Sequence, residues 1–564
     1  MFTSRSIFTA AMMMSFGTCA LYSQTSPWDI NHDGVVNNAD VQLAVNAALG
    51  LASCTADLDG DGRCDIVDVQ RVVNAALGGT CLVTTSMGPL KATTNPHYFV
   101  NTAGKAVLLT GSHTWDDFQD TDQSSSPAAF NFTSYVSFLT SHSQTATILW
   151  HKDLPTYCFW GAGGTWHMSP FPWLRPGPGT ASDGQPKFDV TQFNQAYFDR
   201  LRSRAIQLQQ SNIYAIVELF DGLGINYDRC GTTSPSGDGY PFTGVNNING
   251  IDDGYTSGAS GTGSMTMTAA NAITNIQDAY VKKVIDTLHD LPNVLWEVSE
   301  EAPDNSTWWQ NHMISLIHTY ELGTYGLQHP VGFPSLDVNG ASDSTLYNSN
   351  ADWVAPKSQI SPTSSCGTGS PACKVNFNDS DHSNYFVNMM DSNFNIVPQL
   401  VHNYIWENFL AGSQVLFMDP YEIYWTSNNR NFCSSPSNGV CSGVDPKWNN
   451  LRDNLGYTAT YANKMNLLAM TPQPSLSSTG FCLANAIATG AEYLVYAPSG
   501  GSFTIDLSAM PASRKLAPEW FNPSTGATIA GKPVSAGSSS ESFTPPFKGD
   551  AVLYLVDTAG HSRP

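Results

Sequence analysis

Short apolar runs alternate with helix-like segments through the central part of the chain. Apolar positions recur at helical spacing over 191–210 and 268–290, which predicts amphipathic helices. We predict buried strands at 107–111, 145–150, 213–217, 293–298, 331–333, 353–354, 374–378 and 415–418. Repeated strand–helix units with apolar strands favour a parallel α/β fold. Residues 87–472 therefore suit a (β/α)8 barrel with insertions. A doubly wound nucleotide fold is disfavoured, because the sequence has no Gly-rich nucleotide-binding turn.

Beyond residue 477 the pattern changes to short strand-like runs separated by Pro, Gly and Ser turns. The runs lie at 492–496, 502–507, 516–521 and 551–555. This spacing is typical of an all-β sandwich, which we expect to span 477–559. The sandwich contains no evident pair of acid and base residues, so we expect the chemistry to lie in the barrel.

The first 23 residues have the pattern of an export signal. Arg5 is followed by a short apolar run from Ile7 to Phe16 and then by small residues at 18–20. The run is too short to cross a bilayer, and no other stretch is long and apolar enough. We therefore predict a secreted protein, with lipid attachment at Cys19 as the alternative.

Two acidic loops, at 29–40 and 57–68, repeat with a period of 28 residues, and each leads into a near-identical helix-like segment. Hard oxygen ligands at loop positions 1, 3, 5, 9 and 12, with Gly at position 6, form the pattern of a calcium loop. The predicted ligands are Asp29, Asn31, Asp33, Val35, Asn37 and Asp40, then Asp57, Asp59, Asp61, Arg63, Asp65 and Asp68. The alternative is an acidic turn repeat without metal.

Residues 27–82 resemble type I dockerins in their period, in the helix after each loop and in having Asp at position 12. The resemblance implies a small all-α domain that binds two Ca²⁺ ions. It also implies a partner, the cohesin domain of a scaffold or surface protein.

The charge balance narrows the function classes. The chain has 25 Lys+Arg against 47 Asp+Glu, a net charge of −22, which argues against nucleic acid or an anionic membrane as partner. Only 13% of residues are charged, which is common in secreted proteins that handle neutral polymers. Export makes disulfides the expected state of the cysteines, and Cys366/Cys373 and Cys433/Cys441 are placed to staple loops locally.

Adjacent carboxylates end the apolar run that begins at Asn293. A parallel barrel presents an acid to its substrate at the C-terminal end of a strand. We predict that Glu301 is the general acid/base that breaks a sugar bond, with Glu300 and Glu297 as competing choices. The alternative is a structural carboxylate in an ion pair.

Glycoside hydrolysis needs a second carboxyl group, which should follow a later strand. Asp379 and Asp381 end the strand-like run 374–378, and we favour Asp379 because it directly continues the strand. The alternative is a turn or another acidic loop. Further candidates for substrate contacts follow the other strands: His113, Trp115, Trp150, His151, Asp221, His382, Asp419 and Tyr421.

Aromatic residues crowd the predicted loop 153–187, where rings can stack on sugars or pack the loop onto the barrel. A metal-dependent hydrolase is a weaker alternative, since no His-x-x-x-His pair lies on a predicted helix.

The stretch from Asn293 to Glu301 resembles the strand-four motif of retaining glycosidase barrels, and most of 95–425 is similar to cellulase-like and apiosidase-like barrels. The resemblance implies that Glu301 is the acid/base. It also implies an Asn, which hydrogen-bonds the sugar 2-hydroxyl, at the position of Glu300, and a Glu nucleophile where this chain has Asp. The segments 481–485, 520–523 and 543–547 resemble the collagen-binding-type β-sandwich that follows such barrels.

The prediction from sequence is therefore a secreted, dockerin-bearing glycoside hydrolase that acts on a carbohydrate polymer without a catalytic cofactor. The alternative is a non-catalytic carbohydrate-binding or adhesion protein on a degenerate barrel.

Overall fold

The structure is a computed structural model in which the chain divides into two compact units, Met1–Thr84 and Thr85–Pro564. It describes residues 30–31, 36–53, 64, 69, 72, 89–157, 165–227, 230, 237–254, 263–334, 343–357, 374–381, 389–391, 395–421, 426–427, 430–431, 436–437, 440–441, 444–557 and 559. Each unit is considered by itself.

In the first unit, the helix predicted after the first acidic loop is α1 (Asn38–Ala48). Its first turn is closed by a capping box between Asn37 and Asp40. The buried Asp40 carboxylate also accepts hydrogen bonds from the backbone N–H groups of Ile30 and Asn31, at 2.8 and 3.2 Å. The small core of this unit includes Ala44, Val69 and Val72.

Three of the predicted calcium ligands, Asn31, Asn37 and Asp40, belong to the described part of this unit. The other nine lie outside the described residues: Asp29, Asp33, Val35, Asp57, Asp59, Asp61, Arg63, Asp65 and Asp68. Calcium binding stays a prediction.

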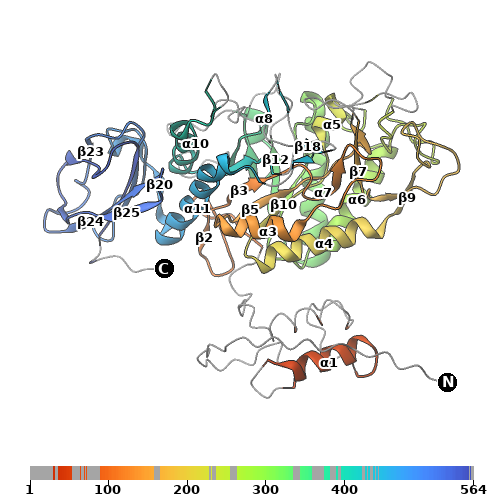
Figure 1. The fold of residues 1–564 in the computed structure, drawn as a ribbon, viewed down its shortest axis with the longest axis horizontal. Helices are drawn as coiled ribbons and strands as arrows, with labels where there is room; N and C mark the ends of the chain where they lie inside the picture. The colour runs from red at the N-terminus through yellow and green to blue at the C-terminus, as the bar shows by residue number, and fades with distance from the viewer. Residues whose placement is uncertain are drawn as a thin grey trace. The chain divides into compact units, whose positions relative to one another are not determined.

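The second unit contains a parallel eight-stranded barrel (Figure 1). Its strands in chain order are β3 (Thr110–His113), β5 (Ala146–Leu149), β10 (Tyr214–Glu218), β11 (Val294–Glu297), β12 (Val331–Pro334), β13 (Trp353–Ala355), β14 (Val375–Asp379) and β15 (Gln414–Met418). Their spatial order follows the chain, and a single parallel bridge between Thr114 and Leu149 joins the first strand to the second, so the barrel is nearly closed. Seven of the eight predicted strands correspond closely to barrel strands, whereas the run predicted at 107–111 overlaps β3 only at residues 110–111.

Helices cover the outside of the barrel. They are α3 (Phe132–Ser141), α4 (Gln195–Gln210), α5 (Gly222–Tyr227), α6 (Ala272–Leu288), α7 (Thr307–Tyr325), α8 (Asp343–Tyr347), α10 (Pro398–Leu410) and α11 (Asn449–Lys464). Short 3-10 turns lie at η1 (Asp304–Ser306), η2 (Pro446–Trp448), η3 (Leu467–Ala469) and η4 (Pro474–Leu476). The helices predicted over 191–210 and 268–290 correspond to α4 and α6.

Side chains alternate along each barrel strand between the interior and the helices. In β11, Leu295 packs in the interior with Ile216 and Phe377, whereas Trp296 packs outward among the helices. Gly332 leaves room in the interior for a large ring, since a Cβ atom there would lie 2.0 Å from the Trp353 indole. The strand ends therefore present inward side chains at a well-packed barrel mouth.

Short antiparallel strands form the loops and flanks of the barrel. They are β1 (Phe99–Val100), β2 (Ala106–Val107), β4 (Asp120–Asp122), β6 (Thr156–Tyr157), β7 (Trp166–Ser169), β8 (Trp173–Leu174), β9 (Asp189–Phe193), β16 (Thr426–Ser427), β17 (Arg430–Asn431), β18 (Pro436–Ser437) and β19 (Val440–Cys441). The sheet β4–β7–β6 and the hairpin β8–β9 follow the first two barrel strands, in the region predicted to be long loops.

An antiparallel sandwich ends the unit. Its strands are β20 (Thr471–Pro472), β21 (Cys482–Asn485), β22 (Glu492–Ala497), β23 (Phe503–Ile505), β24 (Lys515–Asn522), β25 (Ala527–Ala530), β26 (Val534–Ser535), β27 (Glu541–Phe543) and β28 (Ala551–Val556). One sheet runs β20–β21–β22–β28–β24–β25, and a hairpin of β23 and β27 is separate from it. The strand-rich C-terminal region is thus confirmed.

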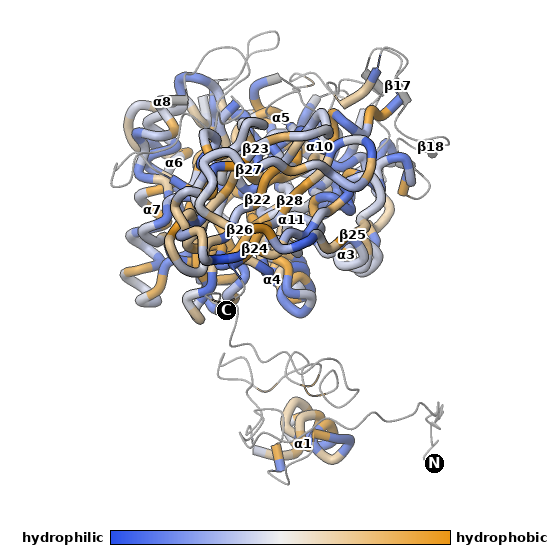
Figure 2. The backbone as a smooth tube through the Cα atoms, turned by 90° about the vertical axis from the view of Figure 1, so that its left-hand side faces the viewer, coloured by the Kyte–Doolittle hydropathy of each residue, from blue (hydrophilic) through white to orange (hydrophobic). Residues whose placement is uncertain are grey.

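The larger sheet packs with one face on the barrel. Tyr493 and Val495 point into the sandwich core. Leu494 and Tyr496 lie on the other face and pack with side chains of α10, such as Trp406, and of α11. Figure 1 shows α10 and α11 next to the sandwich, and Figure 2 shows hydrophobic stretches in orange around β22 and β28. The sandwich therefore shares a hydrophobic core with the barrel.

Three described cysteines bear on the prediction of disulfides. Cys64 and Cys230 are disulfide-bonded, whereas Cys482 is a free, buried thiol. Among the residues that the structure describes, no helix is both long and apolar enough to span a membrane.

Candidate active site

The predicted acids follow the fourth and seventh strands of the barrel. Glu300 and Glu301 lie three and four residues beyond Glu297, which ends β11, and Asp379 is the last residue of β14. The C-terminal ends of parallel strands lie at the same end of a barrel. The structure therefore brings the two acidic segments to one end of the barrel, together with the ends of β3, β5 and β10.

The backbone leaves the barrel abruptly at Glu301, whose φ of 40° lies in the left-handed region. Such a conformation in a non-glycine residue costs about 1–3 kcal/mol and is often found at functional sites. Close packing against the start of α5 fixes this turn, because a Cβ atom on Gly222 would lie 2.2 Å from the carbonyl oxygen of Glu300. Glu301 is 6% exposed, so its carboxyl group is directed by the protein rather than by solvent.

Glu300 is one of the strongly perturbed acids at this end of the barrel. Its backbone N–H donates to the Phe220 carbonyl at 3.3 Å, and it forms a bridge with Asp221. Burial, followed by the negative charges of Asp381, Glu301, Asp379 and Glu218, raises its pKa well above the ordinary range. Its surroundings therefore favour the neutral form, and a neutral carboxylic acid can donate a hydrogen bond as well as accept one.

Asp379 is buried and held in place by neighbouring donors. Its Oδ1 atom accepts from the backbone N–H of Asp381 at 3.0 Å and lies 3.0 Å from Nε2 of His113. The other ring nitrogen of His113, Nδ1, accepts from the indole N–H of Trp150 at 2.8 Å. His113 and Trp150 were predicted to contact substrate, and the structure gives both of them partners within the protein.

A second acidic group surrounds the ends of β5 and β10. Glu218 lies opposite Glu297 in the strand register and accepts from the backbone N–H of His151 at 3.0 Å. Burial raises the pKa of Glu218 well above its ordinary range, against a lowering effect from Lys152 and with a further raising effect from Glu297. The barrel mouth therefore holds several acids but few cations.

Lys152 is the cation in this group, and sequence reasoning gave it no role. Its Nζ atom lies 3.6 Å from Oδ2 of Asp221 and 4.5 Å from the centre of the Trp150 ring. Asp221 also accepts from the backbone N–H of Gly224 at 2.9 Å, and burial is the main cause of its raised pKa. A lysine directly after an apolar strand was the available signal, because buried lysine is rare without an acidic partner.

His151, another predicted substrate ligand, belongs to a buried polar network. Its Nδ1 atom lies 2.8 Å from the Tyr197 hydroxyl, which lies 2.8 Å from the Tyr280 hydroxyl. Nε2 lies 3.4 Å from Oδ1 of Asp153. This network connects the barrel to α4 and α6, so His151 has a structural explanation.

Asp419 and Tyr421, which the sequence predicts to contact sugar, have partners within the protein. The fully buried Arg452 donates to both Asp419 oxygens, at 2.6 and 2.7 Å. The Tyr421 ring packs in the core against Tyr135 and Phe138. Both side chains thus have partners within the protein, and their contact with sugar stays a prediction.

The remaining predicted residues are placed as follows. Trp115 is partly buried, and the centre of its ring lies 6.0 Å from Nζ of Lys152. His382 lies outside the described residues. The described rings of the aromatic loop, Tyr157, Trp166, Phe171 and Trp173, are buried in the main core. The packing interpretation of these rings is therefore the better one.

A metal-dependent hydrolase would need histidine ring nitrogens that point toward one shared metal position. Both ring nitrogens of His113 make hydrogen bonds within the protein. Within the described part of the chain, no three His, Cys, Asp or Glu side chains form a group that could hold a metal ion. At the barrel mouth, His113 and His151 lie close to acids and to the polar atoms of aromatic residues.

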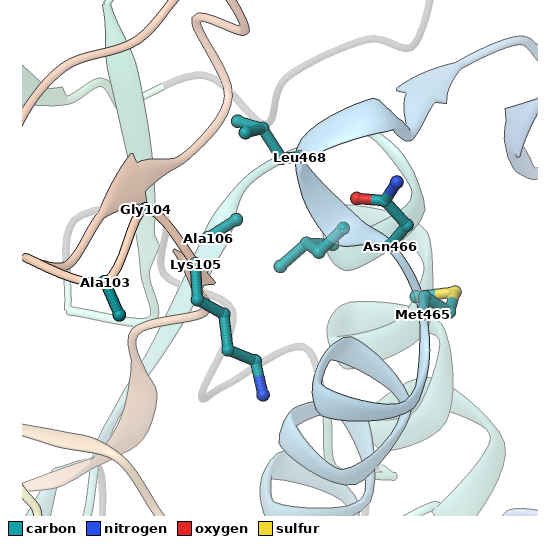
Figure 3. Close-up of a pocket in the computed structure, with 8 residues that line it drawn as sticks. Ala103, Gly104, Lys105, Ala106, Met465, Asn466 and Leu468 are labelled. Carbon is teal, nitrogen blue, oxygen red and sulfur yellow. The ribbon is translucent and has the colours of Figure 1, made fainter. Parts of the chain in front are cut away.

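A cavity of about 400 Å³ lies away from these acids (Figure 3). It is formed by the hairpin of β1 and β2, which precedes the N-terminal end of β3, and by the segment after α11. Figure 3 shows the Lys105 side chain on the hairpin side and Asn466 and Leu468 on the other. Since its lining contains no carboxylate, this cavity is not the candidate site.

Comparisons with known proteins agree with this architecture. Residues 482–556 match the family described as "Putative collagen-binding domain of a collagenase". A glycoside hydrolase of family 5 from Bacteroides vulgatus has a similar structure, with a TM-score of 0.54, 14% identity and coverage of 84% of this chain and 94% of that one. Another structure, called simply a glycoside hydrolase, has a TM-score of 0.50, 13% identity and coverage of 84% and 97%. No curated protein matches the chain. At these identities the likeness shows a shared fold.

Proposed function

We propose that this protein is a glycoside hydrolase that cleaves O-glycosidic bonds with two carboxyl groups. Glu301 is the general acid/base and Asp379 is the second carboxylate. The observation that carries the proposal is the meeting of Glu300, Glu301, Asp379 and Asp381 closely enough for the other three charges to raise the pKa of Glu300. The fold shared with glycoside hydrolases supports it.

The proposed reaction proceeds in two steps with retention of configuration. Asp379 attacks the anomeric carbon, and the bond to the leaving oxygen breaks as Glu301 donates its proton to that oxygen. Glu301 then removes a proton from water, which attacks the anomeric carbon and releases Asp379 and the sugar.

The raised pKa of Glu300 bears on one departure from the resemblance. The resemblance to retaining barrels implies an amide at this position, which donates a hydrogen bond to the sugar. A neutral carboxylic acid can donate as well, and burial favours that form of Glu300.

A screen of polysaccharides and aryl glycosides tests the proposal. The wild type should hydrolyse at least one of them, and Glu301→Gln and Asp379→Asn should each lose about 10²-fold or more in kcat/KM. Glu541→Gln, the same chemical change in strand β27 of the sandwich, is the matched control and should keep full activity. Binding of a sugar polymer without turnover would instead favour the non-catalytic alternative.

The stereochemistry is tested by proton NMR of the first product formed. Retention requires the carboxyl groups to lie about 5–5.5 Å apart, whereas inversion leaves room for water at about 6.5–9.5 Å. We expect the product to have the anomeric configuration of the substrate. The opposite anomer would make Asp379 a general base and exclude the covalent step.

We further propose that residues 27–82 form a dockerin that tethers the secreted enzyme to a cohesin-bearing partner. Its two loops would supply carboxylate, amide and carbonyl oxygens to two Ca²⁺ ions. Calorimetric titration of the full, chelator-treated chain with Ca²⁺ should give two bound ions. Asp33→Asn together with Asp61→Asn should abolish this binding and leave hydrolysis intact.

A further inference from the structure

We propose that His113, oriented by Trp150, is a positioning residue that holds Asp379 in its reactive orientation. This inference rests on the proposed function of Asp379. It assigns His113 and Trp150 a different role from contact with substrate. The three residues form one hydrogen-bond chain, from the Trp150 indole through the His113 imidazole to the Asp379 carboxylate.

The chain fixes the tautomer of His113. An indole N–H can only donate a hydrogen bond, so Nδ1 of His113, 2.8 Å away, must accept it. A ring whose Nδ1 accepts carries its proton on Nε2. Nε2 therefore donates to Oδ1 of Asp379 over 3.0 Å. A second ring proton, on Nδ1, would face the indole proton, so the geometry favours the neutral ring.

The surroundings leave the chain little freedom to move. Trp150, His113 and Asp379 are 1%, 0% and 2% exposed. The indole and imidazole rings stack with their centres 5.4 Å apart and an angle of 24° between their planes. Lys152 Nζ lies 4.5 Å from the centre of the indole ring, which places a cation–π contact behind it.

The three residues come from different parts of the barrel. Trp150 follows β5, His113 ends β3 and Asp379 ends β14. β15 lies between β3 and β14 in the sheet, so the His113 side chain reaches past a strand to Asp379. The chain thus ties the second, first and seventh strands together at the barrel mouth.

The hydrogen bonds to Asp379 determine how its carboxylate is oriented for the reaction. Oδ1 of Asp379 accepts from both the His113 ring and the backbone N–H of Asp381, which fixes the plane of the carboxylate. A neutral donor stabilises the ionised carboxylate without adding a cation that would compete with the sugar for it. Loss of the donor should therefore weaken the ionised form of Asp379 and let its side chain rotate.

Three variants separate positioning from simple packing. His113→Leu removes the donor, His113→Gln retains an amide donor, and Trp150→Phe keeps a ring while removing the indole N–H. We expect His113→Leu to lower kcat about 10–100-fold with a small change in KM and to move the acid limb of the kcat/KM profile to higher pH. His113→Gln should recover part of both effects, and Trp150→Phe should give an intermediate loss. Circular dichroism checks that each variant folds.

A measurement without substrate tests the tautomer. The chain contains 13 histidines, and ¹⁵N–¹H correlation spectra of the ¹⁵N-histidine-labelled full chain are assigned to His113 by comparison with His113→Gln. We expect a neutral ring with its proton on Nε2, and a Trp150→Phe spectrum in which this tautomer is no longer unique. A proton on Nδ1 in the wild type would overturn the proposal.

The two proposals fail in distinguishable ways. If the wild type hydrolyses no glycoside while His113 keeps the expected tautomer, the function is wrong and the hydrogen-bond chain stands. If the enzyme is active but His113→Leu keeps the wild-type kcat and pH profile, the positioning role is wrong and the function stands.

Discussion

Arg452 donates to both carboxylate oxygens of Asp419, at 2.7 Å from Nε and 2.6 Å from Nη2, and both side chains are fully buried. The pair ties the end of β15 to α11. Asp419, which the sequence predicts to contact substrate, thus has a structural partner at the end of the barrel strand.

The variant Arg452→Met tests whether Asp419 has this structural role. It leaves the Asp419 carboxylate buried without its partner, so we expect about 3–5 kcal/mol of lost stability in urea denaturation. The KM of the enzyme that remains folded should stay close to that of the wild type. If Asp419 contacts substrate instead, Asp419→Asn would raise KM while changing the denaturation midpoint little.

Glu300→Gln should be tolerated. Burial and nearby acids raise the folded-state pKa of Glu300 above the unfolded value of about 4.3, so stability falls as pH rises from that value toward the folded pKa. Glutamine does not titrate, so the variant should gain stability of about 1–2 kcal/mol at pH 8 relative to wild type and nothing near pH 4.

Activity provides the second readout for the same position. Because glutamine keeps a donor and an acceptor, kcat/KM of Glu300→Gln near neutral pH should stay within about tenfold of wild type. A loss as large as that of Glu301→Gln would mean that Glu300 works as an ionised or proton-transferring group, contrary to the neutral state inferred from its burial.

Glu407 on α10 gives a pH dependence with a defined window. Burial raises its pKa to about 7, against about 4.3 in the unfolded chain. The unfolded state releases this proton first, so stability falls as pH rises from about 4.3 to about 7 and this contribution is constant above. Glu407→Gln should flatten the curve in that window, measured as melting temperature at half-unit pH steps. An unchanged curve would contradict the burial of this carboxyl group.

The shared core of barrel and sandwich predicts a contrast between two truncations. Removing 477–564 would expose the faces of α10 and α11 that pack against Leu494 and Tyr496, so we expect an aggregating or strongly destabilised barrel. Removing residues 1–84, which form the other compact unit, should leave the barrel's melting temperature unchanged. A stable, active barrel after the first truncation would show that the sandwich is an independent module.

The barrel was predictable because its strands are short apolar runs, and segments between them have apolar residues at helical spacing. The residues at which the strands begin and end were less predictable. The first strand was placed at 107–111 but runs from Thr110 to His113, because its polar residues are inward-facing or hydrogen-bonded within the barrel. The acidic segments after β11 and β14 were found from their positions after apolar runs.

The hydrogen bonds and ion pairs between site residues were not predictable, because they join residues far apart in the chain. His113 and Asp379 meet across 266 positions, and Asp419 meets Arg452 on a helix whose packing depends on the closed barrel. Composition alone could not distinguish aromatic rings that pack a loop from rings that bind sugar. The burial of Trp166 and Trp173 decides this only after the fold is formed.

The leaving-group dependence of Glu301→Gln tests the central claim most directly. Protonation of the leaving oxygen matters most for a poor leaving group, so kcat/KM for an alkyl glycoside should fall about 10²–10⁴-fold. For an activated dinitrophenyl glycoside of the same sugar, the fall should be below about tenfold in the glycosylation step. Equal losses for the two substrates, or no loss for either, would contradict the assignment of Glu301 as the general acid/base.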